Sequence, residues 1–287
     1  MAPSTLKVYN QGLEAFNEFR RECSLGGLWS IPLSEIVDFI AYMYTSGLAH
    51  STVNCYIAGL SFCSKLNNFE DNTGAFVVRK IVDGVKRASL GKPDSRLPIT
   101  RELLGRILLV LPSVCKSRYE SHLFRAAFPL CYHGMVRISE LTTLSNSAFN
   151  HAVRLGEVKR SKDGLEVFLK TSKTDQLGTG RTIYISSQNS KHLCPLLAVN
   201  NFLDCRPKID GPLFCHYDSK PLTRYQFSAI LKRCLSILGV PQSNLTSHSF
   251  RIGMTTQCSI DGYTDEHIKK LRRWRSSVYL RYIRIPK

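Results

Sequence analysis

The segment Thr246-Ser-His-Ser-Phe-Arg-Ile-Gly253 decides how the rest of the chain is interpreted, because it places a histidine and an arginine three residues apart. In a helix, positions i and i+3 lie on one face. Ser247 is the predicted N-cap, and a helix N-terminus presents free N–H groups and a positive dipole end to an anion. His248 is therefore a candidate for moving a proton at a phosphate, and Arg251 is a candidate for holding that phosphate. Alone, H-x-x-R also occurs by chance in many proteins.

A second arginine lies in Tyr132-His-Gly-Met-Val-Arg-Ile-Ser-Glu-Leu141, where apolar residues surround Arg137 and Glu140 follows at i+3. Guanidinium stays protonated and grips two phosphate oxygens in a fork, which lysine cannot do. Two arginines on opposite sides of one phosphate would match the charge that develops there during cleavage. A purely structural ion pair between Arg137 and Glu140 explains this segment equally well.

A candidate general acid lies in Lys170-Thr-Ser-Lys-Thr-Asp-Gln-Leu-Gly178, a turn between two predicted strands. Lys173 is at the centre of this turn, from which it could enter a DNA minor groove and protonate a leaving oxygen. The alternative for this segment is a solvated loop lysine.

The end of the chain is basic and aromatic. From residue 269 to 287, eight of nineteen positions are Lys or Arg, interleaved with Trp274, Tyr279 and Tyr282. Such a helix could bind a membrane or calmodulin, or act as a nuclear address. Either tyrosine could instead attack a phosphodiester.

Charge is distributed unevenly along the 287 residues, whose formal net charge is +17. Residues 1–97 hold 10 Lys/Arg and 9 Asp/Glu, a net charge of +1, whereas the remainder hold 29 and 13, a net charge of +16. A strongly basic folded domain attracts polyanions, since each neutralised phosphate releases counterions. Nucleic acid is the predicted partner, although a merely soluble basic protein has the same composition.

The ten cysteines are scattered, with no C-x-x-C pair and no Cys/His cluster at zinc spacing. They are interpreted as reduced thiols of an intracellular protein. The sequence has no apolar run of about 18 residues and no signal-peptide layout at its N-terminus. We therefore expect no membrane association and no export.

Periodicity predicts a mainly α fold with a small antiparallel β-sheet. Residues 1–88 indicate a bundle of four helices, with Ser34 and Ser51 as N-caps, Gly47 after the second helix and a fourth helix at 76–88. The Gly- and Pro-rich segment 89–98 is the predicted linker to a second domain, 99–287. The elements expected in that domain are helices at 100–112, 118–131 and 137–144, strands at 155–158, 165–169 and 181–185, and helices at 193–204, 223–238, 248–259 and 264–283.

Taken together, Arg in R-x-S-E-L, Lys in the turn S-K-T-D-Q, H-x-x-R, and R-W followed by a tyrosine eight residues later resemble the active site of the tyrosine recombinases, or phage integrases. The resemblance covers nearly the whole chain. It implies a helical core-binding (SAM-like) DNA-clamp domain, a linker and a catalytic domain. The segments Ser172–Gln176, Ser247–Gly253 and Tyr279–Arg284 look most like recombinases of eukaryotic mobile elements of the Crypton and DIRS types.

The resemblance implies a role for each matching residue. Arg137 and Arg251 would hold the scissile phosphate and Lys173 would act as general acid. His248 would assist proton transfer, and Glu140 would support the site. Trp274 would position the phosphate or pack beside the nucleophile, which would be Tyr282.

The implied reaction is attack by the tyrosine oxygen, which gives a 3′-phosphotyrosyl link and a free 5′ hydroxyl. Bond energy is conserved in this link, so religation would need no metal, ATP or small-molecule cofactor. The same residues fit a topoisomerase of the single-tyrosine (IB-like) type, or a domesticated DNA-binding protein that keeps the fold without catalysis. The resemblance implies double-stranded DNA as the partner and a dimer or tetramer on that DNA, and a nuclear location if the source is eukaryotic.

Two features depart from the family pattern. The family often has L-G-R-W where this chain has Leu271-Arg-Arg-Trp274, and only five residues follow Tyr282, whereas many relatives continue into a helix that docks on a neighbouring subunit. Oligomer assembly is therefore the part of the resemblance that these residues support least.

Overall fold

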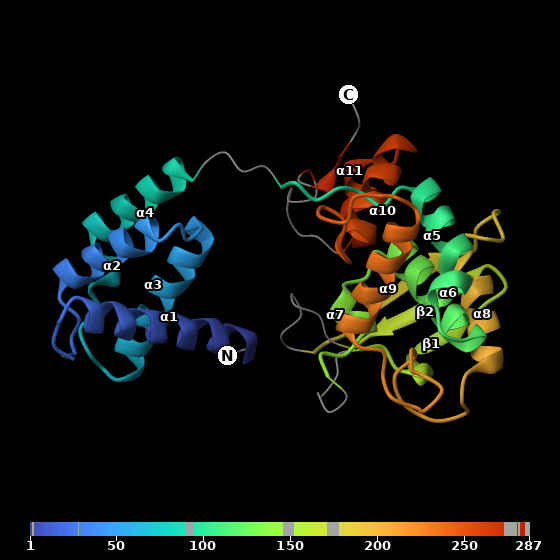
Figure 1. The fold of residues 1–287 in the computed structure, drawn as a ribbon, viewed down its shortest axis with the longest axis horizontal. Coiled ribbons are helices and arrows are strands. Elements are labelled where there is room, and N and C mark those ends of the chain that lie inside the picture. The colour runs from blue at the N-terminus through green and yellow to red at the C-terminus, as the bar shows by residue number, and fades with distance from the viewer. Residues whose placement is uncertain are drawn as a thin grey trace. The chain divides into compact units, whose positions relative to one another are not determined.

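The computed structural model describes residues 1, 3–27, 29–89, 94–145, 152–170, 178–272, 280 and 282–284. The chain divides into two units, Met1–Asp94 and Ser95–Lys287 (Figure 1). Each has its own buried apolar core. The predicted fold class, mainly α with a small antiparallel sheet, is confirmed.

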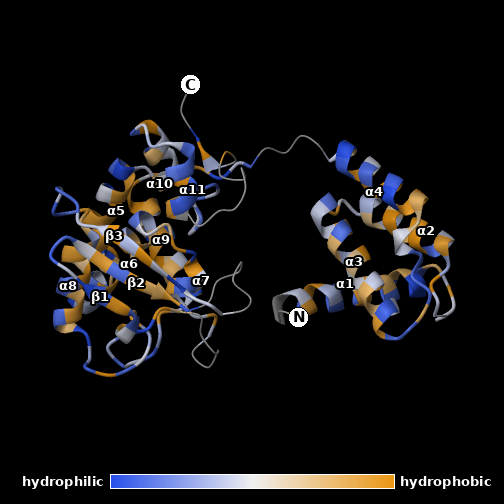
Figure 2. Cartoon of the chain, turned by 180° about the vertical axis from the view of Figure 1, so that it is seen from behind, coloured by the Kyte–Doolittle hydropathy of each residue, from blue (hydrophilic) through white to orange (hydrophobic). Residues whose placement is uncertain are grey.

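The N-terminal unit is a bundle of amphipathic helices. In Figure 2, α4 carries both hydrophilic and hydrophobic residues, on different sides of the helix. The two glycines Gly12 and Gly59 let α1 and α3 pack closely, because a Cβ on Gly12 would lie 2.9 Å from the Cα of Tyr56. Phe16 and Phe39 fill the core. The elements of this unit are α1 (Pro3–Glu22), α2 (Leu33–Thr45), α3 (His50–Leu66), the 3₁₀ turn η1 (Asn72–Gly74) and α4 (Phe76–Ala88).

The ends of α2 and α3 differ in part from the prediction. Gly47 follows α2 with a φ of +75°, which suits glycine. Ser34 and Ser51, however, are not N-caps. Each is the second residue of its helix, because Pro32 and Ala49, two residues earlier, occupy the N-cap position with extended backbone.

The core of the C-terminal unit is organised around α6, which is buried along most of its length. Helices α5, α8 and α10 all pack against it. Phe124, Phe128, Phe227 and Phe250 form part of this core. The helices of this unit are α5 (Arg101–Val114), α6 (Arg118–His133), α7 (Ile138–Leu141), α8 (Pro195–Cys205), α9 (Arg224–Ile237), α10 (Ser249–Ile260) and α11 (Asp265–Arg272).

The sheet has the antiparallel order β1-β2-β3, with β1 at Val158–Arg160, β2 at Gly164–Leu169 and β3 at Arg181–Ser186. Leu165 pairs with Ile185, and α8 packs against both β2 and β3. The first strand was predicted too early: residues 155–157 form the 3₁₀ turn η2 (Leu155–Glu157), in which the Glu157 carboxylate accepts a hydrogen bond from the Arg154 N–H.

Two predicted helices have other limits. The helix expected at 137–144 is only α7, because Thr143 is extended and bridges to Thr223 at the start of α9. The helix expected at 264–283 is α11 for its first part. Residues 273–279 and 281 lie outside the described residues, and Leu280 and Tyr282 have 3₁₀ conformation. The α-helix therefore does not continue through Tyr282.

All ten cysteines are free thiols. Within the described residues, no helix is long and apolar enough to cross a membrane. No group of three or more His, Cys, Asp or Glu side chains in the same part of the chain could hold a metal ion.

Candidate active site

Arg137 follows the turn that ends α6 and is the N-cap residue of α7. Met135, two residues earlier, has a φ of +45°, so the chain turns sharply before this arginine. The backbone of Arg137 is extended, and its side chain is 21% exposed. The guanidinium is therefore held in place yet accessible to a ligand.

Glu140 holds Arg137 at two points. Its Oε2 accepts a hydrogen bond from the Arg137 backbone N–H at 2.8 Å, and its Oε1 accepts one from Nη1 at 3.0 Å. The Glu140 side chain is only 2% exposed, and its backbone carbonyl accepts a bond from the Val153 N–H at 2.8 Å. A buried carboxylate needs such partners. The ion pair expected from the sequence is present, and it orients the arginine as well as compensating its charge.

The second arginine reaches the same turn from α10. Arg251 is 3% exposed, and its Nη1 donates a hydrogen bond to the backbone carbonyl of Met135. That carbonyl lies two residues before Arg137. Two arginines 114 positions apart in the sequence are thus brought to one turn of the backbone.

Gly253 allows α10 to lie where it does. A Cβ at this position would lie 1.8 Å from the carbonyl oxygen of Ile99. The Ile99 N–H in turn donates to the carbonyl of Ser249 at 3.0 Å. The chain segment that leads into α5 therefore lies directly on the first turns of α10, and only glycine leaves room for it.

His248 lies at the start of α10, at the N-cap position that was predicted for Ser247. Two local hydrogen bonds accompany this difference: the Thr246 hydroxyl accepts from the His248 N–H, and the Ser249 hydroxyl accepts from the Thr246 N–H. The helix begins one residue later than predicted. The half-buried imidazole lies beside the beginning of the helix.

Tyr282 contacts His248. Their ring centroids are 5.1 Å apart, and the rings are tilted by 48°. The tyrosine is half-buried, and its backbone carbonyl accepts a bond from the Thr256 hydroxyl of α10 at 3.3 Å. A nucleophile candidate and a proton-acceptor candidate, 34 positions apart in the sequence, are therefore neighbours.

Of the residues singled out in the sequence, Arg137, Glu140, His248, Arg251 and Tyr282 are brought together by α7, α10 and the segment after α11. Lys173 and Trp274 lie outside the described residues, as does Tyr279. Thr256 and Met135 contact this set and were not singled out in advance. Met135 lies within a quoted segment, but nothing in the sequence marks its carbonyl as a partner.

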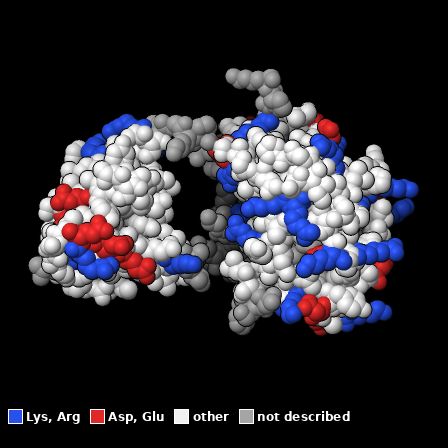
Figure 3. All heavy atoms as spheres, viewed as in Figure 1, with Lys and Arg blue, Asp and Glu red and all other residues white. Residues whose placement is uncertain are grey.

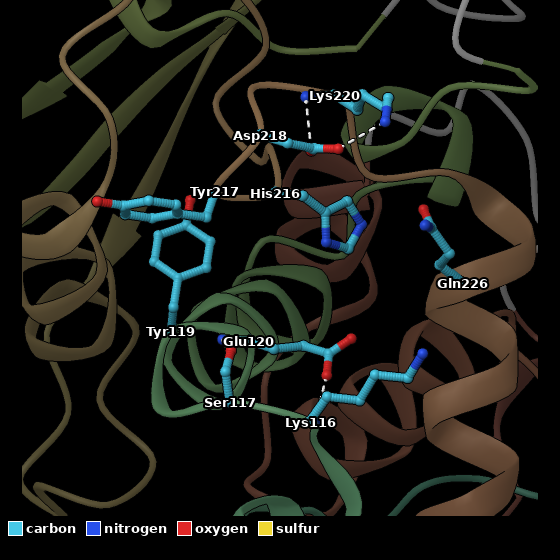
Figure 4. A pocket seen from close by; sticks show the side chains of 9 residues that line it. All are labelled: Lys116, Ser117, Tyr119, Glu120, His216, Tyr217, Asp218, Lys220 and Gln226. Atoms are coloured by element: carbon cyan, nitrogen blue, oxygen red, sulfur yellow. Dashed lines mark hydrogen bonds and ion pairs between the residues drawn. The ribbon is translucent and has the colours of Figure 1, made fainter.

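Two cavities of the C-terminal unit lie away from this cluster. One, of about 680 Å³, lies between the start of α5 and the 190–193 loop. The other, of about 430 Å³, is drawn in Figure 4. Both of its carboxylates have partners: Asp218 pairs with the Lys220 ammonium at 2.7 Å, and Glu120 accepts a hydrogen bond from the backbone N–H of Lys116. The candidate active-site residues line neither cavity.

The chain is similar to known recombinases in sequence and in fold. The chain is 24% identical over 286 residues to an integrase/recombinase XerD homolog of Selenomonas ruminantium, covering 92% of this chain and 76% of that protein. No protein-family profile matches the chain.

Solved structures share the fold. A XerH site-specific recombinase bound to a palindromic difH substrate in a post-cleavage complex aligns with a TM-score of 0.69 and 17% identity, over 98% of this chain and 76% of that one. A lambda integrase dimer bound to a COC′ core site aligns with a TM-score of 0.64 and 17% identity, over 98% and 72%. The Tn1549 transposon integrase with circular-intermediate DNA gives 0.57 and 15%, over 99% and 96%. The chain has the fold of the tyrosine recombinases.

Proposed function

We propose that this protein is a DNA strand transferase of the tyrosine-recombinase type, which cuts and rejoins DNA through a 3′-phosphotyrosyl intermediate. The observation that carries this proposal is the convergence of Arg137, Arg251, His248 and Tyr282 from three distant parts of the sequence. Metal-free phosphodiester cleavage requires cations on the phosphate, a proton acceptor and a hydroxyl nucleophile, together with an acid for the leaving oxygen. Similarity to recombinases solved on DNA supports the choice of substrate.

In the proposed reaction, the two guanidiniums bind the non-bridging oxygens of the phosphate. The Tyr282 oxygen attacks phosphorus and passes its proton toward His248, and the bond to the 5′ oxygen breaks. A free tyrosine has a pKa of about 10, so its hydroxyl needs an acceptor as it attacks. Lys173 is proposed to protonate the leaving oxygen, and Trp274 to pack beside the nucleophile. The reverse sequence rejoins the strand.

Surface charge supports DNA as the partner. On the face visible in Figure 3, Lys and Arg side chains of the C-terminal unit far outnumber Asp and Glu, whereas the N-terminal unit displays both signs. This matches the net charges of +16 for residues 98–287 and +1 for residues 1–97. We propose that residues 99–287 form the catalytic domain, that 89–98 is a linker, and that 1–88 is a helical clamp on DNA.

The proposal also covers the oligomeric state on DNA and the kind of organism from which the protein comes. We propose that the protein acts as a dimer or tetramer on DNA, as the lambda integrase was solved as a dimer on its core site. The segments Ser247–Gly253 and Tyr279–Arg284 carry the resemblance to Crypton- and DIRS-type mobile elements. If the source is eukaryotic, the protein would work in the nucleus.

The test is a suicide substrate, a nicked duplex from which the cleaved end diffuses away so that the covalent intermediate accumulates. We expect a protein–DNA adduct that survives denaturing electrophoresis and forms without metal or ATP. DNA binding with no adduct on any candidate element end would instead identify a catalytically silent DNA-binding protein. Relaxation of supercoiled DNA without strand exchange between two duplexes would identify a topoisomerase.

A further inference from the structure

Thr256 joins α10 to the segment that carries Tyr282. Its hydroxyl donates a hydrogen bond to the Tyr282 carbonyl at 3.3 Å and accepts one from the Arg284 backbone N–H at 3.0 Å. A threonine hydroxyl can donate once and accept as well, and this one does both. The side chain is buried, with 5% of the residue exposed. A single group thus bonds the backbone on both sides of residue 283.

The neighbouring threonine shows that this arrangement is not a general property of the helix. Thr255, fully buried, donates its hydroxyl to the Arg251 carbonyl four residues earlier at 2.7 Å. That back-bond within the helix is the usual choice for a helical threonine. The Thr256 hydroxyl instead points to another part of the chain. It is therefore engaged in tertiary structure.

Apolar packing also supports this segment. Ile283 packs on a small cluster formed by Met135, Cys258 and Ile268. Met135 is the residue whose carbonyl accepts the bond from Arg251. The segment that carries Tyr282 is therefore fixed to the same turn of backbone that gathers the arginines.

We propose that Thr256 is a positioning residue: its hydroxyl holds the Tyr282 backbone so that the tyrosine oxygen of the same chain meets the phosphate held by the arginines. This proposal rests on Tyr282 being the nucleophile, as proposed above. Attack needs the reacting atoms about 3–3.5 Å apart, and a misplacement of about 1 Å costs on the order of 10²-fold in rate. Two hydrogen bonds, one to the carbonyl of Tyr282 and one from the N–H of Arg284, are suited to prevent such a displacement.

The test compares Thr256→Val, which keeps the shape and removes the hydroxyl, with Thr256→Ser, which keeps the hydroxyl. Thr255→Val is the matched control, because it makes the same change one residue away. With saturating full-length protein on a suicide substrate, we expect adduct formation by Thr256→Val to slow on the order of 10²-fold. Thr256→Ser should restore most of the rate, and Thr255→Val should stay near wild type. DNA affinity should be unchanged throughout.

A second substrate separates nucleophile placement from damage to the acid step. A substrate with sulfur at the 5′ bridging position expels a thiolate, which needs no proton. Thr256→Val should remain slow on it, because the attacking oxygen is still misplaced. Recovery of the rate on this substrate would overturn the proposal, as would equal rates for Thr256→Val and wild type.

Amide hydrogen exchange tests the contact without relying on catalysis. The Arg284 amide should exchange faster in Thr256→Val than in wild type and Thr256→Ser. Unchanged exchange would overturn the proposal even if the enzyme is active. If exchange changes as expected but wild-type protein forms no adduct on any substrate, the proposed function fails, and the positioning role fails with it.

Discussion

Replacing Arg137 with lysine separates catalysis from structure at the first arginine. If Arg137 binds phosphate, its replacement should lower the rate of DNA cleavage. If it only forms an ion pair with Glu140, its replacement should lower stability alone. Lysine keeps the positive charge and can still reach the buried Glu140 carboxylate. It cannot reproduce the planar fork that would bind two phosphate oxygens. The bond from the backbone N–H of residue 137 to Glu140 Oε2 is unaffected by the change.

The expected cost to folding is modest. One charge-assisted hydrogen bond, from Nη1 to Oε1 at 3.0 Å, is exchanged for a less directional ion pair. Because the Arg137 side chain is 21% exposed, solvent screens part of this interaction, and we expect a loss of about 1 kcal/mol. In a unit of this size, that lowers Tm by roughly 2–4 °C. Losing a transition-state donor costs far more, about 10²–10³-fold in rate.

The assay measures adduct formation per folded molecule on a suicide substrate, together with urea unfolding of the same preparation. Arg154→Lys is the matched control. Arg154 has the same spacing to Glu157, and its backbone N–H donates to Glu157 Oε2 at 2.8 Å, but its side chain is exposed and is not one of the candidate active-site residues. Should Arg137→Lys lose stability yet form adduct at the wild-type rate per folded molecule, Arg137 would be a structural residue only.

Two further predictions concern stability. Gly253→Ala places a Cβ 1.8 Å from the Ile99 carbonyl oxygen, so the free energy of unfolding should fall by at least about 1–3 kcal/mol. The control is Gly105→Ala, whose Cβ would have its nearest neighbour 3.9 Å away and should cost no stability. Equal urea midpoints for the two variants would refute the close packing at Gly253. Burial, aided by the positive charge of Arg101, lowers the pKa of His133 to about 4. Below pH about 6.5 the unfolded chain binds a proton at this histidine, whereas the folded protein does not until the pH approaches 4. The free energy of unfolding should therefore be unaffected by His133 above pH about 6.5 and should decline as the pH falls toward 4. An identical decline in His133→Gln would contradict this prediction.

Local sequence patterns predicted most of the helices, because apolar periodicity and turn residues are local properties. Helix ends were less predictable. Ser34, Ser51 and Ser247 are good capping residues, yet α2 and α3 each begin two residues earlier than predicted and α10 begins one residue later. The early end of α7 depends on the bridge between Thr143 and Thr223, 80 positions apart, which no local pattern reveals.

In the candidate site, too, local patterns identified the residues but not the long-range contacts between them. Residue types and their order indicated Arg137, His248, Arg251 and Tyr282, but not how they meet. The contact between the rings of His248 and Tyr282 and the bond from Arg251 to the Met135 carbonyl depend on how α10 packs on the end of α6. Tyr282 was expected in a continuous helix but has 3₁₀ conformation, and its carbonyl bonds to Thr256 of α10, a tertiary contact that no local pattern reveals.

Peptide mapping of the trapped protein–DNA complex is the most direct test of the central claim. The account predicts that the nucleotide is attached to Tyr282, that Tyr282→Phe abolishes the adduct while sparing DNA binding, and that Tyr279→Phe leaves it intact. A nucleotide on Tyr279 would contradict the assignment of the nucleophile, and an adduct on neither tyrosine would contradict the mechanism.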